Sequence, residues 1–316
     1  MATAPEIVRL KDPTQTIPFR TMIEMITLLV VTSIPPPAGL EWRDARADIR
    51  GVHALLADSY VASADRQVRI RYSHETVAWM LGAAHSSLQL GLGVPGEQSL
   101  VGFVSAMPSS LIIRGSPRED SVEVTLLCVR CSWRKRGLVP MLLAELRCRA
   151  AALGVQSAIY TAAQPRGQPL VCAACFHRPL RPHRLHQLRF WEPVLTTSGR
   201  LEAAIAEAAR LPHPPAGVAS LQPLGDADCR DCHELHRRRG ERSALGRLLS
   251  PEEFRYRYGR GSAARSFIAR GEDGTAAGFV SFLLVPLQTP GGDVVQVRER
   301  PCDLAACAVR EYVSGH

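Results

Sequence analysis

The most constraining feature of the sequence is a strand, a basic loop and an amphipathic helix in direct succession. Apolar alternation predicts a strand over Ser121–Val129, followed by the basic loop Arg130–Gly137. A helix is predicted from about Pro140 to Leu153 and ends at Gly154. Amides at a helix start, together with adjacent cations, suit an anion such as a pyrophosphate. The unit therefore predicts an α/β fold with a phosphate cradle; a solvated basic turn is the alternative interpretation of the loop.

Similar patterns predict further elements on both sides of this unit. The expected helices cover Asp44–Tyr60, Ser73–Leu81, Leu201–Arg210, Asp226–Arg239 and Pro251–Tyr258. The expected strands cover Leu88–Val94, Leu100–Pro108, Val155–Thr161, Ser266–Arg270 and Ala276–Pro286. Both halves thus run helix, helix, strand, turn, strand, which hints at a doubled α/β unit. Residues 1–33 show no clear pattern, and Pro193–Pro215 is typical of a linker.

Composition excludes several classes of protein. With 316 residues, of which 46% are hydrophobic and 22% charged, the chain is neither disordered nor fibrous. Its formal charge is +8, but almost all of the positive charge is arginine, with lysine only at Lys11 and Lys135. This usage, spread along the whole chain, is more typical of a GC-rich genome than of a binding surface. No nucleic-acid partner is predicted.

The longest apolar run, Met22–Ile34, contains Glu24 and ends at Pro35–Pro37. It is too short for a transmembrane segment and lacks the cationic start and cleavage site of a signal peptide. Nine cysteines, an odd number, argue against a secreted disulfide framework. These observations predict a soluble, cytoplasmic protein without a transmembrane segment.

Ordered sequence blocks around the basic loop resemble the N-myristoyltransferase (glycylpeptide N-tetradecanoyltransferase) family. The blocks are Tyr60-Val61, Arg69–Glu75, Leu100–Pro108, Glu123–Val129, Arg134–Arg136, Ala158–Ala162 and His177–Leu180. The loop pattern Arg-x-x-Gly also resembles the acyl-CoA loop of GCN5-related acyltransferases. The resemblance implies a GCN5-related mixed sheet of the α/β (α+β) class, built as two fused similar halves. We expect an acyl-CoA-binding half over 1–195 and a peptide-binding half over 196–316.

The resemblance implies transfer of myristoyl from myristoyl-CoA to the N-terminal glycine amine of peptides or nascent proteins. Myristoyl-CoA is then a co-substrate, with no cofactor and no metal. The backbone amides of Leu126 and Leu127 would form the oxyanion hole. The implied acyl-CoA contacts are Cys128, Val129, Arg134, Lys135, Arg136, Gly137, Leu138 and Val139.

On the peptide side, the resemblance places Thr161 near the glycine amine. The other implied peptide contacts are Tyr60, Val61, His177 and Ser281. Each also has a structural interpretation: a core aromatic, a strand-end hydroxyl or a hydrogen-bonded structural histidine.

The sequence departs from the family pattern at several places, three of which bear most on the proposed site. Leu126 replaces the usual phenylalanine, and Ala62–Ala64 replace most of an acidic run that ends at Asp65. The chain stops at His316, short of the family's C-terminal segment, whose terminal carboxylate acts as the base. An incomplete second half is therefore expected. A catalytically inactive relative that binds acyl-CoA or peptide is one alternative, and a GCN5-type N-acyltransferase of other specificity is another.

Cysteine spacing supplies a further alternative. Three Cys-x-x-Cys pairs occur: Cys128/Cys131, Cys172/Cys175 and Cys229/Cys232, the last beside His233 and His236. Any two of these pairs could form a tetrahedral zinc site. The gaps of about 40 and 53 residues exceed those of zinc ribbons. A zinc-stabilised binding module is accordingly the less favoured interpretation.

Overall fold

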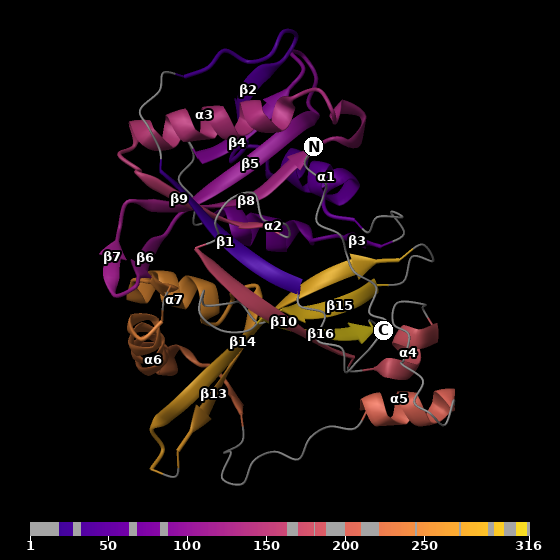
Figure 1. Cartoon of the computed structure of the whole chain (residues 1–316), viewed down its shortest axis with the longest axis vertical. Coiled ribbons are helices and arrows are strands. Elements are labelled where there is room, and N and C mark those ends of the chain that lie inside the picture. Colours follow the sequence, from indigo (N-terminus) through magenta and orange to yellow (C-terminus); the bar gives the residue numbers. More distant parts are fainter. Residues whose placement is uncertain are drawn as a thin grey trace.

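The computed structural model describes residues 19–27, 33–62, 68–82, 88–162, 170–179, 181–187, 200–209, 221–243, 245–271, 273–289, 294–299 and 308–314. They form a mixed α/β structure around one 13-stranded sheet, with a separate three-stranded sheet beside it (Figure 1). The predicted α/β class with a mixed sheet is confirmed. None of the helices in these ranges is long and apolar enough to cross a membrane.

One end of the large sheet comes from the first 162 residues. Its strands, in spatial order, are β2 (Glu41–Asp44), β4 (Gln89–Gly93), β5 (Leu100–Pro108), β8 (Ser121–Val129) and β9 (Ser157–Ala162). All of these neighbours are antiparallel except β8 and β9, which run parallel. The strands predicted over these segments are confirmed, β5 and β8 with the bounds expected. The turn before β5 contains Gly96 at a φ of 80°, a conformation that favours glycine.

The next strand in the sheet corrects the sequence analysis. β1 (Phe19–Thr27) lies between β9 and β10 (Val171–Pro179) and is antiparallel to both. The prediction that residues 1–33 lack a pattern is wrong for this segment. Its ladder partners lie more than a hundred residues further along the chain, so no local turn or paired strand marks it in the sequence.

The rest of the sheet comes from the second half of the chain. The order continues with β16 (Ala308–Ser314), β15 (Val294–Glu299), β14 (Ala276–Gln288), β13 (Ala264–Arg270) and β11 (Gln222–Pro223). β16 is parallel to β10, and the short β3 (Arg69–Ile70) pairs with β14. The small sheet joins β12 (Leu245–Leu248) to β6 (Ser110–Ile113) and β7 (Ser116–Arg118). Both sheets thus cross the expected boundary at 195/196, and the division into two halves stays a prediction.

Helices cover both faces of β5 and β8. α3 (Leu138–Ala152) packs on the face that carries Val104 and Val122, and Figure 1 shows it lying across these strands. α1 (Ile49–Ser59) and α2 (His74–Gly82) cover the face that carries Phe103. Adjacent strand residues point to opposite faces, so Val104 and Phe103 belong to two separate cores.

Most helix starts follow the predicted signals. Ser73, the first residue of the predicted helix, caps α2 by accepting a 3.1 Å hydrogen bond from the Thr76 amide. α1 begins later than predicted, because Asp44 ends β2 and Asp48 caps the helix through the Gly51 amide at 2.8 Å. The remaining helices are α4 (Pro182–Gln187), α5 (Leu201–Ala209), α6 (Cys229–Glu241) and α7 (Pro251–Tyr258). Of these, α4 has no counterpart among the predictions.

Candidate active site

The parallel strands β8 and β9 stop pairing about halfway along β8. Their ladder runs from Ser121↔Ser157 to Val124↔Tyr160, although β8 continues to Val129. Beyond this point β9 pairs only with β1, for example Thr161 with Ile23, while β8 follows β5. Beyond this point, the main-chain groups of β8 and β9 that face each other are no longer partners in a β-ladder. The polar edge of β8 becomes available where the ladder ends.

A β-bulge lies at this point. Between the pairs Phe103↔Cys128 and Ser105↔Thr125, two residues of β8, Leu126 and Leu127, stand opposite Val104. Leu126 has a φ of 54°, in the left-handed region. This conformation costs a leucine about 1–2 kcal/mol, and persists because the surrounding packing holds it.

Core packing shows the same bulge independently. Before it, Val122 and Val124 pack into the α3 core; after it, Leu127 and Val129 do. The inward positions therefore change from even to odd numbers. Leu126 is only 4% exposed and packs into the opposite core, against α1 and α2. The extra residue takes the peptide at Leu126 and Leu127 out of the regular ladder, which is the arrangement that two oxyanion donors require.

The basic loop follows directly from the same strand. Lys135 and Gly137 both have positive φ, at 64° and 73°, and Gly137 is the residue before α3. Alternating backbone handedness makes successive amides converge on one point, a geometry that binds anions. Leu138 begins the helix and is buried. The Lys135 and Arg136 side chains are exposed, and the Arg136 guanidinium carbon lies 4.6 Å from the Trp133 ring centre.

Two other arginines of the loop bind protein carbonyls. Arg134 donates from Nε to the Val129 carbonyl oxygen at 3.1 Å, and from Nη2 to that of Ser59. Arg130 donates twice to the Leu100 carbonyl oxygen, at 3.1 and 2.8 Å. Arg134, expected on the CoA phosphates, therefore braces the loop against the end of α1. Lys135 and Arg136 remain as the exposed cations among the residues predicted for the phosphates.

The apolar residues predicted for acyl-CoA lie in the cores. Burial raises the pKa of the Cys128 thiol to about 12, so this side chain is a neutral core group. Val129 and Val139 pack into the α3 core. Only main-chain groups of these three residues are therefore suited to contact a polar ligand.

Comparison with known proteins shows similarity to one family. A family model, the N-terminal domain of myristoyl-CoA:protein N-myristoyltransferase, matches residues 31–175, which include the bulge and the cradle. The glycylpeptide N-tetradecanoyltransferase of Saccharomyces cerevisiae is 30% identical over 266 residues, covering 80% of this chain and 57% of the relative. The crystal structure of Saccharomyces cerevisiae N-myristoyltransferase with bound myristoyl-CoA superposes with a TM-score of 0.72, at 27% identity, over 91% of this chain and 70% of that chain. Over 80% of its length the chain is similar to an N-myristoyltransferase, and residues 31–175 match the N-terminal domain of that family.

A second N-myristoyltransferase relative gives the same extent of similarity. The enzyme of Eremothecium gossypii is 29% identical over 257 residues, covering 78% of this chain and 56% of the relative. The chain therefore spans somewhat more than half the length of the curated relatives it matches.

The residues predicted to contact the peptide are only partly brought together in the structure. Thr161 is exposed on β9, next to the point where the ladder with β8 ends. Tyr60 is half-buried at the end of α1, its ring centre 6.2 Å from that of Tyr72. The carbonyl oxygen of Val61 accepts a 2.9 Å hydrogen bond from the Ile70 amide. These three residues lie on the segments that border the α1 and α2 face.

The other two predicted peptide residues lie on distant strands. His177 is on β10, opposite Arg310 of β16, and its side chain lies outside the described residues. Ser281 is on β14, six strand positions from β8 in the sheet order. It is buried, with its hydroxyl 2.9 Å from that of Ser266 on β13. In this structure the Ser281 hydroxyl is therefore one member of a buried cross-strand pair of hydroxyl groups.

A buried hydroxyl beside the bulge was missed by sequence reasoning. Ser105 is fully buried on β5, opposite Thr125, and its Oγ has no hydrogen-bond partner in the described part of the chain. Gln89 of β4 stands opposite Ser105, so a polar row crosses three strands and ends beside Leu126. A serine within the apolar strand Leu100–Pro108 was the available signal.

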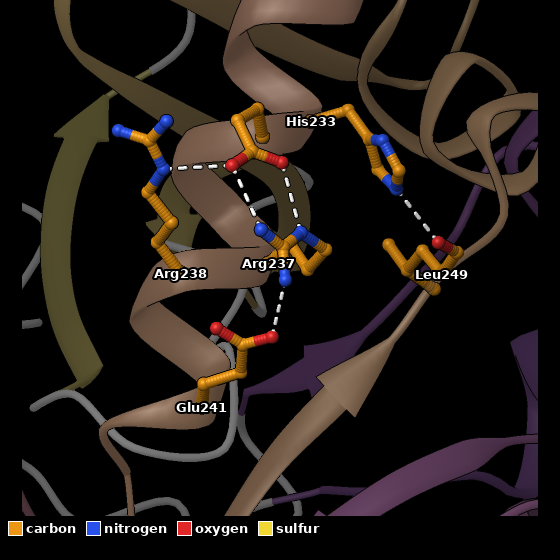
Figure 2. Close-up of polar contacts among 6 residues, drawn as sticks. His233, Arg237, Arg238, Glu241 and Leu249 are labelled. Carbon is orange, nitrogen blue, oxygen red and sulfur yellow. Dashed lines mark hydrogen bonds and ion pairs between the residues drawn. The ribbon is translucent and has the colours of Figure 1, made fainter.

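Buried cysteines of α6 fill core positions. Cys229 and Cys232 pack with Phe254 and Tyr258, and burial raises the pKa of both thiols, that of Cys232 to about 12. His233 donates from Nε2 to the Leu249 carbonyl oxygen at 2.7 Å (Figure 2). Within the described ranges, no group of three or more His, Cys, Asp or Glu side chains could hold a metal ion. The side chains of Cys172 and Cys175 lie outside the described residues.

Proposed function

We propose that this chain is a protein N-myristoyltransferase that moves myristoyl from myristoyl-CoA to the amine of an N-terminal glycine. One observation carries the proposal: the bulge at Leu126 and the cradle at Gly137 lie on one continuous strand–loop–helix unit. A thioester and a pyrophosphate are parts of one CoA conjugate, and this unit offers main-chain donors for each of them.

In the proposed reaction, the cradle amides of Leu138 and Val139 bind the pyrophosphate, assisted by Lys135 and Arg136. The thioester carbonyl oxygen lies against the Leu126 and Leu127 amides. The glycine amine attacks the carbonyl carbon, and the C–S bond breaks as the tetrahedral intermediate collapses. The amine loses a proton and the CoA thiolate gains one. Because main-chain amides stabilise the oxyanion, leucine in place of phenylalanine at position 126 is compatible with catalysis.

The peptide side of the proposal rests on Thr161, Tyr60 and Val61. The exposed Thr161 hydroxyl lies beside the end of the β8–β9 ladder, where an amine would approach the thioester. His177 and Ser281 remain predictions for more distant peptide positions. We also propose an acyl-CoA-binding half over 1–195, a peptide-binding half over 196–316, and a cytoplasmic location, where nascent glycine termini meet acyl-CoA.

Mass spectrometry of a peptide substrate tests the proposal. Purified protein is incubated with myristoyl-CoA and a peptide that begins with glycine, and a peptide that begins with alanine is the control. We expect the mass increase of one myristoyl group on the glycine peptide alone. Binding of myristoyl-CoA, measured by calorimetry, without modification of either peptide would instead favour the inactive acyl-CoA-binding relative. Equal modification of both peptides would indicate a different N-acyltransferase.

A further inference from the structure

A buried ion pair joins the bulged strand to the second half of the chain. Nη2 of Arg247, on β12, lies 2.5 Å from Oε2 of Glu123, on β8. The side chains are 7% and 19% exposed respectively. Arg257 of α7 also attracts Glu123 electrostatically, and both arginines favour the charged form of this carboxyl group and so lower its pKa. Charges this deeply placed need a partner, since an isolated buried charge is strongly disfavoured.

The ion pair lies on the face of the sheet where the proposed chemistry occurs. Side chains two residues apart in a strand share a face, so Glu123 shares one with Thr125. The Ser121 and Ser157 hydroxyls are 2.6 Å apart, which shows that this face continues onto β9. Thr161, four residues beyond Ser157 in a regular register, therefore lies on the same face as Glu123.

Arg247 is itself held firmly in place. β12 pairs with β6 over four residues, with Arg247 opposite Leu111. Leu111, Ile159 and Leu245 form a buried cluster that seats this small sheet on the large one. On the other side, a Cβ at Gly246 would lie only 2.6 Å from the Gly240 carbonyl oxygen, so β12 packs directly against the end of α6. Arg247 therefore has a fixed position from which it binds the Glu123 carboxylate.

The bulge could relax by a register slip of the segment that precedes it. If the first half of β8 slid by one residue along β5, the extra residue would leave the ladder and Leu126 could become extended. That slip would turn Glu123 onto the apolar α3 face and turn Val122 and Val124 away from it. The carboxylate would leave Arg247 for a hydrocarbon core. The buried ion pair therefore opposes the slip directly.

We propose that Arg247 and Glu123 are a positioning pair, which locks the register of β8 and so maintains the Leu126–Leu127 bulge. Neither side chain touches the reacting atoms. The pair acts through the main chain of β8, three residues before Leu126.

The first test reads the bulge directly and does not depend on any activity. Leucine-labelled protein is examined by NMR for the backbone φ of Leu126, in wild type and in Arg247→Met. We expect a positive φ in wild type and an extended conformation in the variant. Arg270→Met is the matched control, because it removes the Arg270–Asp228 ion pair on β13 without touching β8. A positive φ in folded Arg247→Met would overturn the proposal.

The second test rests on the proposed function. Myristoyl-CoA labelled with 13C at the thioester carbon is bound, and its carbonyl stretch is recorded by infrared spectroscopy. We expect Arg247→Met to bind within about threefold of wild-type affinity, since the phosphate cradle is separate. Its kcat should fall at least about tenfold, and its carbonyl stretch should return toward the value in free acyl-CoA. Wild-type affinity, kcat and carbonyl stretch in the variant would contradict the inference.

A milder variant covers the case in which Arg247→Met does not fold. Glu123→Gln keeps the shape and removes the charge, and Arg247→Lys keeps the charge but loses the fork-shaped donor. We expect both variants to lie between wild type and Arg247→Met in kcat and in the share of molecules that have a positive Leu126 φ. Failure of wild type to bind or transfer myristoyl would refute the proposed function, while the NMR result would still decide the positioning role.

Discussion

The phenol of Tyr256 donates a 2.6 Å hydrogen bond to the main-chain carbonyl oxygen of Trp79, and the Trp79 indole donates one of 3.2 Å back to that of Tyr256. Their rings are stacked, with centres 6.1 Å apart and planes 12° from parallel. Trp79 belongs to α2 and Tyr256 to α7. This reciprocal contact fastens the helix that follows the Tyr60–Val61 segment to the second half of the chain.

Gly82, at the end of α2, leaves the space that the Tyr256 hydroxyl occupies. We expect Tyr256→Phe to lower the free energy of unfolding by about 1 kcal/mol, through the lost hydrogen bond. Gly82→Ala should cost about 1–3 kcal/mol, because the new methyl group meets that hydroxyl. In the double variant the hydroxyl is gone, so the combined cost should be less than the sum. Urea denaturation measures all three, and strict additivity would show that the two sites are not in contact.

The left-handed conformation of Leu126 predicts an inverted order of two small substitutions. Leu126→Ala and Leu126→Gly remove the same buried side chain and should both destabilise the protein. In an ordinary strand the alanine variant would be the more stable. At a φ of 54° glycine is unstrained, so we expect the glycine variant to be more stable by about 1 kcal/mol. Thermal or urea unfolding measures the stabilities of the two variants. A more stable alanine variant would show that Leu126 is extended.

The two kinds of arginine in the basic loop predict different effects. Arg136→Ala removes an exposed cation and should weaken myristoyl-CoA binding about five- to tenfold, with little loss of stability. Arg134→Ala removes two hydrogen bonds to carbonyl oxygens and should also lower the free energy of unfolding by about 2 kcal/mol. Calorimetry and urea denaturation separate the effects, with exposed Arg118→Ala on β7 as the control. Equal stability losses in both loop variants would contradict this division.

The Glu145 carboxylate predicts a pH dependence of stability. It is 1% exposed on α3 and accepts hydrogen bonds from the Ser33 hydroxyl, the Ile34 amide at 2.9 Å and Arg149 Nε at 2.8 Å. Burial alone would raise its pKa, but these donors outweigh burial and lower the pKa below its ordinary value.

A carboxyl whose pKa is lower in the folded state stabilises the protein above its unfolded pKa, and this stabilisation disappears as pH falls through the folded pKa. We expect Glu145→Gln to cost about 2 kcal/mol at pH 7, and less on acidification below about pH 4. Unfolding curves of wild type and variant between pH 3 and 8 test this. A difference independent of pH would mean that the carboxylate charge is not involved.

Chelation should leave the unfolding transition unchanged. The Cys229 and Cys232 thiols are buried beside Phe254, and their raised pKa values disfavour the thiolate that zinc requires. We expect the same Tm before and after dialysis against EDTA, measured by calorimetry. Stoichiometric zinc in the purified protein, or a lower Tm after dialysis, would support the zinc-stabilised alternative.

Elements with local signals were predictable from the sequence. The bounds of α7 are as expected, because Ser250 and Glu253 form a capping box and Pro251 begins the helix. β8 is equally well marked by its apolar residues. The loop before α3 was predictable from its basic composition and from Gly137, which has a positive φ in the structure.

Features that depend on distant partners were not predictable. The two adjacent leucines of β8 interrupt the alternation, but nothing local shows that Leu126 is left-handed, because the bulge arises only against β5. An arginine in a basic loop can bind a phosphate or a carbonyl oxygen. Only the structure shows that Arg134 lies close enough to Ser59 to bind its carbonyl oxygen. The Glu123–Arg247 pair joins residues 124 positions apart.

The place of β1 in the sheet has a consequence for how the chain folds during synthesis. Ile23 pairs with Thr161 on one side and Val171 on the other, so each partner is synthesised roughly 140 residues later. At about 5–20 residues per second, β1 waits on the order of 10–30 s with both edges unpaired. An unpaired strand that contains Met22, Ile23, Met25 and Ile26 is a target for misassociation. β1 is therefore exposed to misassociation during synthesis until β9 and β10 emerge and pair with its two edges.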